Sequence, residues 1–368
     1  MKIFVFSLNT QSLRFYESLS EEVVRLHRTD TVSGWLYNGI YADFLPELLE
    51  KIKQSDADIV VFCSQEEVFP GSYFHTHLLR DVMNEMLYSL YDDMSLMGVG
   101  KTSVKNILKG DPTVRGLVCS VYVKEQIHFT SPCPRKKYLK NCYTDSVFRN
   151  KGATCIYLTL SSGSQHSRDI TLAIVNAHLP FDASSLVQSV QKKDAIIRQD
   201  ALNKQNDFFN AFYRHLILNS PAVNDNFCAV LAGDFNYRFL PYFNWSASQT
   251  RMDIMRYFPL TPEKIPEFRK MFAQNDEFTI QKEKKNIYSV DEGPDNGGPL
   301  FPPTCKLDTR RNPGTLFYKT GKWDQRTPSY CDRILHKNLT CLEYDIFNVG
   351  NISLSDHVAV YGIYEISL

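Results

Sequence analysis

Several features of membrane and secreted proteins are missing from this sequence. No apolar run approaches the roughly 20 residues that a membrane-spanning helix needs. The opening segment MKIFVFSLNT turns polar too soon for a signal peptide, so we expect it to be a first strand. The nine cysteines are odd in number and include no CxxC pair. This argues against a disulfide framework and a zinc site, and it predicts a cytoplasmic protein with reduced thiols.

The sequence also lacks a net charge, internal repeats and long low-complexity linkers. Forty-one basic residues balance forty-one acidic ones. No overall field therefore attracts the chain to nucleic acid, and any recognition of an anion must be local. We expect no nucleic-acid partner.

What the sequence does have is an alternation of strand and helix patterns from end to end. Helical patterns occupy 44–53, 77–91, 184–218 and 261–273, the last with Thr261 and Pro262 at its expected start. The region 280–326 is rich in loop residues. Short β-branched and aromatic runs predict strands at 2–8, 58–64, 116–123, 154–161, 170–177, 227–233, 330–336 and 357–368. The simplest interpretation is one α/β domain over residues 1–368.

Polar residues recur where these predicted strands end. Each has an ordinary explanation by itself, such as a turn, a helix start or an ion pair, but their recurrence indicates a shared site. Carboxylates, carboxamides and histidines in this combination suit a Mg²⁺ site that acts with a general base on water. The residues at the strand ends are Asn9, Gln65, Glu66, Asn176, His178, Asp234, Asn236, Asp332, Asp356 and His357.

Six sequence blocks resemble the signatures of inositol polyphosphate 5-phosphatases. These blocks are RNKGAT, NAHLPFDA, AGDFNYR, FPPTCK, TPSYCDRIL and LSDHVAV, and the resemblance extends from Asn9 to His357. That family consists of Mg²⁺-dependent enzymes of the endonuclease/exonuclease/phosphatase superfamily. The resemblance implies a DNase I-like four-layer sandwich, an α/β fold of the α+β type in which two packed β-sheets are flanked by helices. It also implies hydrolysis of the 5-phosphate of phosphoinositides or soluble inositol polyphosphates.

The same resemblance implies roles for individual residues. Asp234 would activate the attacking water, and Asn236 would help to orient it. His178 and His357 would contact the phosphate, with Asp332 orienting His357 and keeping it protonated. The full catalytic set it implies is Asp234, Asn236, His178, His357, Asp332 and Asp356.

The resemblance further implies a metal site and a substrate-facing rim. Asn9 and Glu66 match the metal-site positions, with Glu66 as the direct ligand to Mg²⁺, and Asp356 would lie on the metal or leaving-group side. The rim residues it implies are Asn150, Lys151, Asn176, Tyr237, Arg238, Lys306 and Arg333.

The sequence departs from the family pattern at one position that bears on specificity. Cys305 stands where the family usually has a tyrosine that helps to grip the neighbouring 4-phosphate. Lys306 is retained beside it. The requirement for a 4-phosphate is therefore left open, as is the preferred inositol compound.

Three alternatives about substrate and activity also stay open. Aromatic segments at 68–74 and 239–245 and a basic run at 133–140 are compatible with peripheral contact with lipid, and equally with a packed core and a solvated surface. A nuclease or sphingomyelinase-type phosphodiesterase would share the fold. A phosphoinositide-binding module with little turnover would share the site.

Overall fold

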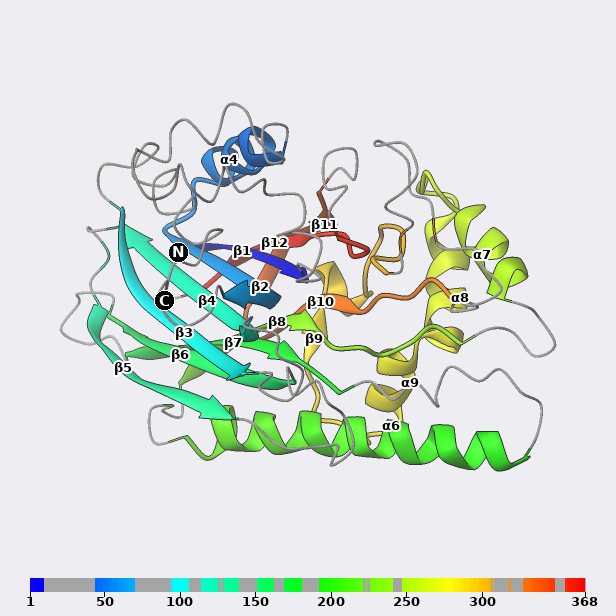
Figure 1. Cartoon of the computed structure of the whole chain (residues 1–368). Coiled ribbons are helices and arrows are strands. Elements are labelled where there is room, and N and C mark those ends of the chain that lie inside the picture. The colour runs from blue at the N-terminus through cyan, green and yellow to red at the C-terminus, as the bar shows by residue number, and fades with distance from the viewer. Residues whose placement is uncertain are drawn as a thin grey trace, which may run out of the picture.

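Two six-stranded sheets form the centre of the fold (Figure 1). The computed structural model describes residues 1–9, 44–69, 94–105, 114–124, 127, 129–138, 151–161, 169–180, 192–220, 223, 226–240, 247–305, 307, 318, 327–347 and 355–367. The first sheet has the order β11-β12-β1-β2-β4-β3 and the second the order β5-β6-β7-β8-β10-β9. In each sheet one central pair is parallel, β1 with β2 and β7 with β8.

The strands have the following bounds. In the first sheet they are β1 (Lys2–Asn9), β2 (Ile59–Phe69), β3 (Met94–Lys105), β4 (Val114–Lys124), β11 (Thr340–Ile346) and β12 (Val360–Glu365). In the second sheet they are β5 (Phe129–Tyr138), β6 (Gly152–Leu160), β7 (Ile170–His178), β8 (Phe227–Asp234), β9 (Asp291–Glu292) and β10 (Asp332–Lys337).

Helices cover the outer faces of both sheets. Figure 1 shows α4 (Phe44–Ser55) beside the first sheet and the long α6 (Lys192–Tyr213) along the second. A π-helical turn, η3 (Arg214–Leu218), continues α6. Three shorter helices gather at one end of the molecule: α7 (Ala247–Met255), α8 (Ile265–Asn275) and α9 (Glu277–Glu283). The layers therefore run helix, sheet, sheet, helix. Among the described residues, no helix is long and apolar enough to cross a bilayer.

The two-residue period of the strands decides which side chains lie between the sheets. In β8, Cys228, Val230 and Ala232 belong to the core between the sheets, whereas Ala229 and Leu231 pack with the aromatic residues of α6. Successive side chains of a strand point to opposite faces, so the next even-numbered residue, Asp234, continues the inward-facing row.

The same alternation of side chains holds for the other central strands, and it explains where the polar residues lie. Ile3 and Val5 of β1, and Ile170, Leu172 and Ile174 of β7, belong to the core between the sheets. Extending these rows in steps of two reaches the polar residues at one end of the intersheet space: Ser7, Asn9, Gln65, Asn176, His178, Asp234 and Asp332. The sheets thus deliver their polar strand ends to a common mouth.

The expected elements compare with the structure as follows. All eight predicted strands are confirmed, as are the helices at 44–53 and 261–273 and the described part of the helix at 184–218. The helix at 77–91 lies outside the described residues. Strands β3, β5, β9 and β11 were not predicted, because edge strands carry more polar residues and prolines than central ones. The basic run at 133–140 begins within β5.

Two boundaries differ from the prediction. Helix α8 begins at Ile265 rather than next to Thr261, whose carbonyl instead accepts from the backbone N–H of Lys264 in a turn that leads into the helix. Pro266 then occupies the first turn of α8, where a missing N–H costs nothing. Helix α9 extends to Glu283 and so enters the region expected to be loop.

Candidate active site

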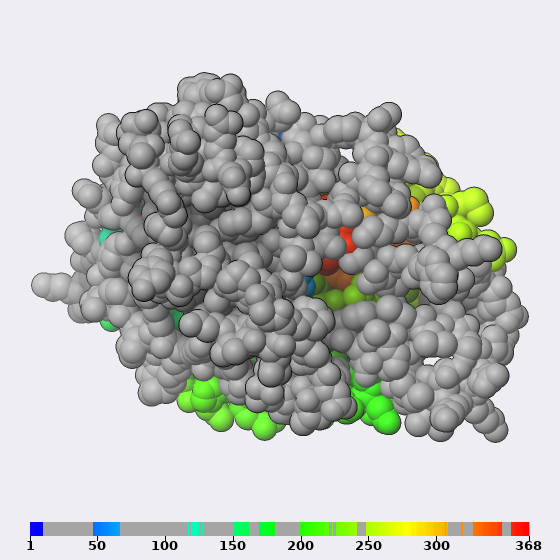
Figure 2. Space-filling model, viewed as in Figure 1, coloured from blue at the N-terminus to red at the C-terminus, as the bar shows by residue number. Residues whose placement is uncertain are grey.

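Three neighbouring strands of the second sheet place His178, Asp234 and Asp332 side by side. His178 of β7 is in register with Asp234 of β8, and Asp234 is in register with Asp332 of β10. Gly233 allows this close approach, because a Cβ there would lie 1.9 Å from the carbonyl oxygen of Ala177 and its φ is +146°. Figure 2 shows a hollow in this face of the molecule, where blue, green and orange-red segments come to the surface together.

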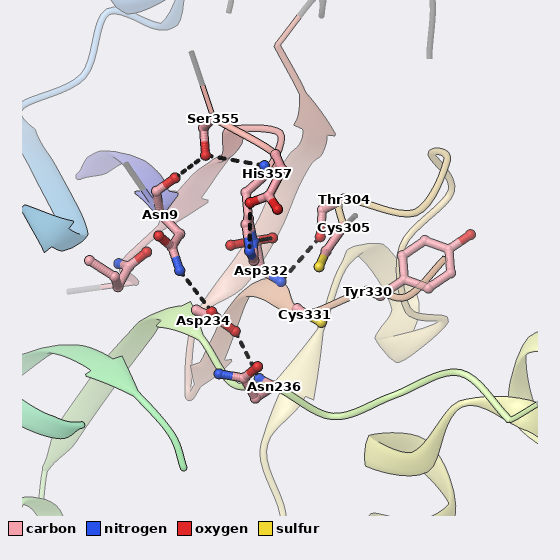
Figure 3. Close-up of polar contacts among 12 residues, drawn as sticks. Asn9, Asp234, Asn236, Thr304, Cys305, Tyr330, Cys331, Asp332, Ser355 and His357 are labelled. Carbon is pink, nitrogen blue, oxygen red and sulfur yellow. Dashed lines mark hydrogen bonds and ion pairs between the residues drawn. The ribbon is translucent and has the colours of Figure 1, made fainter. Parts of the chain in front are cut away.

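Asp234 is the centre of the hydrogen bonding at the mouth (Figure 3). Its Oδ2 accepts from Nδ2 of Asn9 at 2.9 Å, and its Oδ1 accepts from the backbone N–H of Asn236 at 3.0 Å. Nε2 of His178 lies 3.3 Å from Oδ2. Burial by itself would raise the pKa of Asp234, but the hydrogen bond and charge of His178, with His357 and Lys151, lower it below its ordinary value. Asp234 is therefore held as a buried carboxylate.

His357 and Asp332 form a buried pair. Nδ1 of His357 lies 2.8 Å from Oδ2 of Asp332. Burial favours neutral imidazole, yet the adjacent carboxylate prevails and raises the pKa of His357 well above its ordinary value. Nε2 of His357 is 3.7 Å from Oδ1 of Asp356. His357 is thus in contact with the carboxylate that was expected to orient it, and the roles of the two residues stay predictions.

His178 differs from His357 in its electrostatic environment. It is completely buried, Nζ of Lys151 contacts its Nε2, and Oε1 of Glu66 lies 3.7 Å from that nitrogen. Burial, followed by the charge of Lys151, lowers the pKa of His178. The two histidines therefore meet at one mouth with pKa values displaced in opposite directions.

Glu66 reaches the mouth through a break in the regular register of β2. The pairing of β2 with β4 shifts between Ser64 and Glu67, and Glu66 has a φ of +55°. A β-bulge of this kind redirects a side chain that an unbroken strand would point to the opposite face. Burial would raise the pKa of Glu66, but His178 and Lys151 lower it.

Ser355 joins the end of β1 to the segment that carries His357 and was not predicted as a site residue. Its hydroxyl donates to the backbone carbonyl of Asn9 at 2.5 Å and accepts from the backbone N–H of His357 at 3.1 Å. Ser355 thereby fixes the segment that carries His357 against the end of β1. The only signal for Ser355 in the sequence is a hydroxyl residue two places before a histidine. This pattern is too common in proteins to identify a site residue.

Arg238 lies along one wall of the site. Its Nη2 donates to Oδ1 of Asn236 at 2.8 Å and its Nη1 to Sγ of Cys305 at 3.7 Å. Asn236 has a φ of +57°, and its Nδ2 donates to the carbonyl of Leu179 at 3.0 Å. Cys305 is buried and forms β-bridges with Ser329 and His357. The thiol is therefore a packed part of the wall behind the guanidinium of Arg238.

Two residues expected on the substrate-facing rim lie in the core instead. Tyr237 is completely buried, and its hydroxyl donates to Oδ1 of Asn206 on α6 at 2.9 Å. Arg333 is also completely buried, between the carboxylates of Asp276 and Glu292. Arg333 lies in β10 one residue out of step with Asp332, so it points to the helical side, and Tyr237, which follows the end of β8, packs on that side as well. This corrects the predicted placement.

The remaining expected rim residues have mixed outcomes. Asn176 is completely buried below the mouth, where its amide bridges the two sheets through Gln65 and Ser64. Lys151 lies at the mouth beside His178. Asn150 and Lys306 lie outside the described residues.

The mouth has the donor chemistry of a divalent-cation site. One ligand atom each from Asp234, Asp332 and His357 lie within 4.8 Å of one another, the one such group among the described residues. Oδ1 of Asp332 is buried and has no hydrogen-bond partner in the described part of the chain. A buried carboxylate oxygen of this kind fits a ligand to a divalent cation. Asn9 and Glu66, expected at the metal, lie at the same mouth against Asp234 and His178.

The chain belongs to the Endonuclease/Exonuclease/phosphatase family 2, which matches residues 30–363. No curated protein matches it. The fold is the DNase I-like sandwich of that family. The family match makes the chain a phosphoesterase hydrolase of the endonuclease/exonuclease/phosphatase superfamily.

Solved structures show the same fold at low sequence identity. One is the inositol polyphosphate 5-phosphatase domain of SPsynaptojanin in complex with inositol (1,4)-bisphosphate and calcium ion, with a TM-score of 0.56 and 18% identity, covering 99% of this chain and 84% of that one. Another is the ferrous NO complex of Cimex nitrophorin, with a TM-score of 0.51 and 14% identity, covering 100% of this chain and 99% of that one. Proteins this different share the architecture, so substrate must be argued from the site.

Proposed function

We propose that this protein is a Mg²⁺-dependent phosphomonoesterase that removes the 5-phosphate from inositol polyphosphates or phosphoinositide headgroups by direct attack of water. The observation that carries the proposal is the convergence of Asp234 with the Asp332–His357 pair at one mouth between the sheets. The sequence blocks around these residues resemble 5-phosphatases, which supports the choice of substrate. The similar synaptojanin domain was solved with an inositol bisphosphate and a calcium ion, which supports the same choice.

Five polar residues of the mouth have a part in this reaction. Asp234, held in place by hydrogen bonds from Asn9 and Asn236, accepts the proton of the attacking water. Protonated His357, oriented by Asp332, donates to a phosphate oxygen on which charge develops. A divalent cation at the mouth, when bound, would neutralise negative charge on the phosphate.

The surroundings of the mouth suit a densely anionic substrate. Two cationic side chains lie next to residues that contact Asp234: Lys151 contacts His178, and Arg238 donates to Asn236. Since the whole chain has no net charge, these local cationic groups, together with a divalent cation at the carboxylates, support recognition of a compact polyphosphate rather than a long polyanion. A free inositol phosphate and a lipid headgroup present the same phosphorylated ring, and we favour the headgroup, with peripheral membrane contact.

The test is phosphate release from a panel of soluble inositol phosphates and of phosphoinositides in vesicles, with Mg²⁺ present. We expect release only from compounds that carry a 5-phosphate, and none from Asp234→Asn assayed in parallel. Faster cleavage of single-stranded DNA or sphingomyelin would show a phosphodiesterase instead. Tight headgroup binding without release at saturating Mg²⁺ would show a binding module.

A further inference from the structure

A layer of buried polar side chains separates the apolar core from the mouth. Ser7, Gln65 and Asn176 are completely buried. Nε2 of Gln65 donates to Oδ1 of Asn176 at 2.8 Å and lies within hydrogen-bonding distance of the Ser7 hydroxyl at 3.2 Å. Nδ2 of Asn176 donates to the backbone carbonyl of Ser64 at 2.9 Å. These bonds join β2 of the first sheet to β7 of the second.

Burial alone does not explain amides at these positions. The preceding inward-facing residues of the two strands, Cys63 and Ile174, belong to the apolar core between the sheets. Burying an amide costs free energy unless it is hydrogen-bonded, and apolar side chains could fill the same space. Apolar contact is also non-directional, so it does not fix how one sheet lies along the other. Hydrogen bonds have preferred distances and angles, so hydrogen bonds between the sheets do fix the position of one sheet along the other.

The candidate site is divided between the two sheets. Asn9 and Glu66 come from the first sheet, whereas His178, Asp234 and Asp332 come from the second. The contacts that assemble it, from Asn9 to Asp234 and from Glu66 to His178, both cross the gap. Their geometry therefore depends on the relative position of the sheets.

The polar layer lies directly beneath these contacts. Gln65 precedes Glu66 and is in register with Asn9. Asn176 precedes His178 by two residues on the same inward-facing row. We infer that Gln65 and Asn176 are positioning residues: their amide pair locks the two sheets in the register at which the halves of the active site meet. The effect on catalysis rests on the proposed function, whereas the lock itself does not.

The experiment replaces the amide pair with apolar residues of similar size in Gln65→Met/Asn176→Leu. Exchanging both partners of a buried polar pair can be nearly neutral for stability, so we expect a cooperative melting transition within a few degrees of the unaltered protein. In a crystal structure of this variant we expect the bond from Asn9 to Asp234, 2.9 Å in the unaltered chain, to be broken. Mg²⁺ affinity, measured by calorimetry without substrate, should weaken.

The kinetic readout separates positioning from substrate contact. We expect kcat to fall by about 10- to 100-fold, because displacement of reacting groups by about 1 Å has consequences of that size. KM should change much less, since neither amide reaches the substrate. If the unaltered protein hydrolyses no inositol compound, the proposed function fails, while the crystal structure of the variant still decides on the lock.

Two further variants control for stability. Ile174→Val removes one methylene from the next inward-facing position of β7 and should lower the melting temperature without changing kcat or the Asn9–Asp234 bond. Gln65→Asn/Asn176→Gln keeps an amide pair of the same total length and should recover activity lost in Gln65→Asn, even if the apolar pair does not fold. Two results would overturn the inference. One is an intact Asn9–Asp234 bond with wild-type Mg²⁺ affinity in the apolar variant. The other is an activity of Gln65→Asn/Asn176→Gln that is no higher than that of Gln65→Asn.

Discussion

Asp332 and Arg333 are consecutive residues of β10, yet they belong to two different clusters of buried charge. Asp332 faces the mouth with His357, while Arg333 faces the helical side with Asp276 and Glu292. Both clusters are almost completely removed from water. They differ in how fully their polar atoms are paired.

The Arg333 cluster uses its hydrogen-bonding capacity within the protein. Nη1 of Arg333 donates to Glu292 at 2.7 Å, Nη2 to Asp276, and Nε to the carbonyl of Tyr330 at 2.8 Å. The second oxygen of Glu292 accepts from Tyr344 at 3.1 Å, and that of Asp276 caps α9 at Thr279. Nothing in this arrangement is reserved for a ligand.

The cluster at the mouth has buried polar atoms that are not hydrogen-bonded. One oxygen of Asp332, and Nδ1 of His178, have no hydrogen-bond partner within the described residues. An unpaired buried polar atom costs free energy, so a protein that retains one is expected to use it for a ligand. Between these two clusters, pairing is complete where the charges hold the fold together and incomplete where a ligand is expected.

The largest expected effect is on turnover, in Asp234→Asn. Loss of the base should lower kcat by about 10²–10⁴. Stability should also fall at neutral pH, because His178, His357 and Lys151, which lower the pKa of Asp234, stabilise its charged form in the folded protein. Phosphate release and thermal melting measured together check both parts. Turnover near that of the unaltered chain would place the base elsewhere.

For Arg333→Met we expect a large loss of stability and no effect on substrate binding. This change leaves Asp276 and Glu292 buried without their cation, which should cost about 3–5 kcal/mol of the free energy of unfolding. Urea denaturation measures it. KM of the folded fraction should stay unchanged, because Arg333 does not reach the mouth. The matched control adds Asp276→Asn and Glu292→Gln to Arg333→Met, which should restore most of the stability. A raised KM in the single variant would show that Arg333 contacts the substrate.

A third expectation concerns Mg²⁺. A ligand at a hundred times its Kd stabilises the protein that binds it by about 2.7 kcal/mol. We expect Mg²⁺ at that excess to raise the melting temperature of the unaltered protein, and a chelator to reverse the rise. Asp332→Asn should show little of this shift. An equal shift in that variant would locate the cation away from Asp332.

The smallest effect is expected for Tyr237→Phe. Removing the hydroxyl breaks one buried hydrogen bond to Asn206, at a cost of about 1 kcal/mol in the free energy of unfolding. Chemical denaturation measures the loss, and kcat/KM should not change. A lower kcat/KM with unchanged stability would show that the phenol acts at the site.

The period-2 pattern made much of the site predictable. It located the central strands and the polar residues at their ends, among them Asp234, His178 and Asp332. It could also have excluded Arg333 from the rim, because Arg333 stands one residue out of step with the inward-facing row, whereas Tyr237 follows the end of β8 and lies outside the pattern. Assigning rim roles block by block gave the opposite placement, and burial corrects it.

Other features depend on contacts that no local pattern contains. Asn9 and Asp234 are 225 residues apart, and the hydroxyl of Ser355 meets the carbonyl of Asn9 across 346. The edge strands could not be predicted from the sequence for a related reason. Their pairing with a neighbouring strand, rather than their own composition, makes them strands.

The sequence by itself determined which residues are strand ends and which chemistry they can perform, because side-chain alternation and functional groups are local properties. Tertiary structure alone decided that the ends of two separate sheets meet at one mouth. It also decided that Gln65 and Asn176 pair beneath that mouth, and that Asp332 is left with an unpaired oxygen while Arg333 is not. These outcomes depend on which distant groups satisfy each buried donor and acceptor, and only the packed fold settles that pairing.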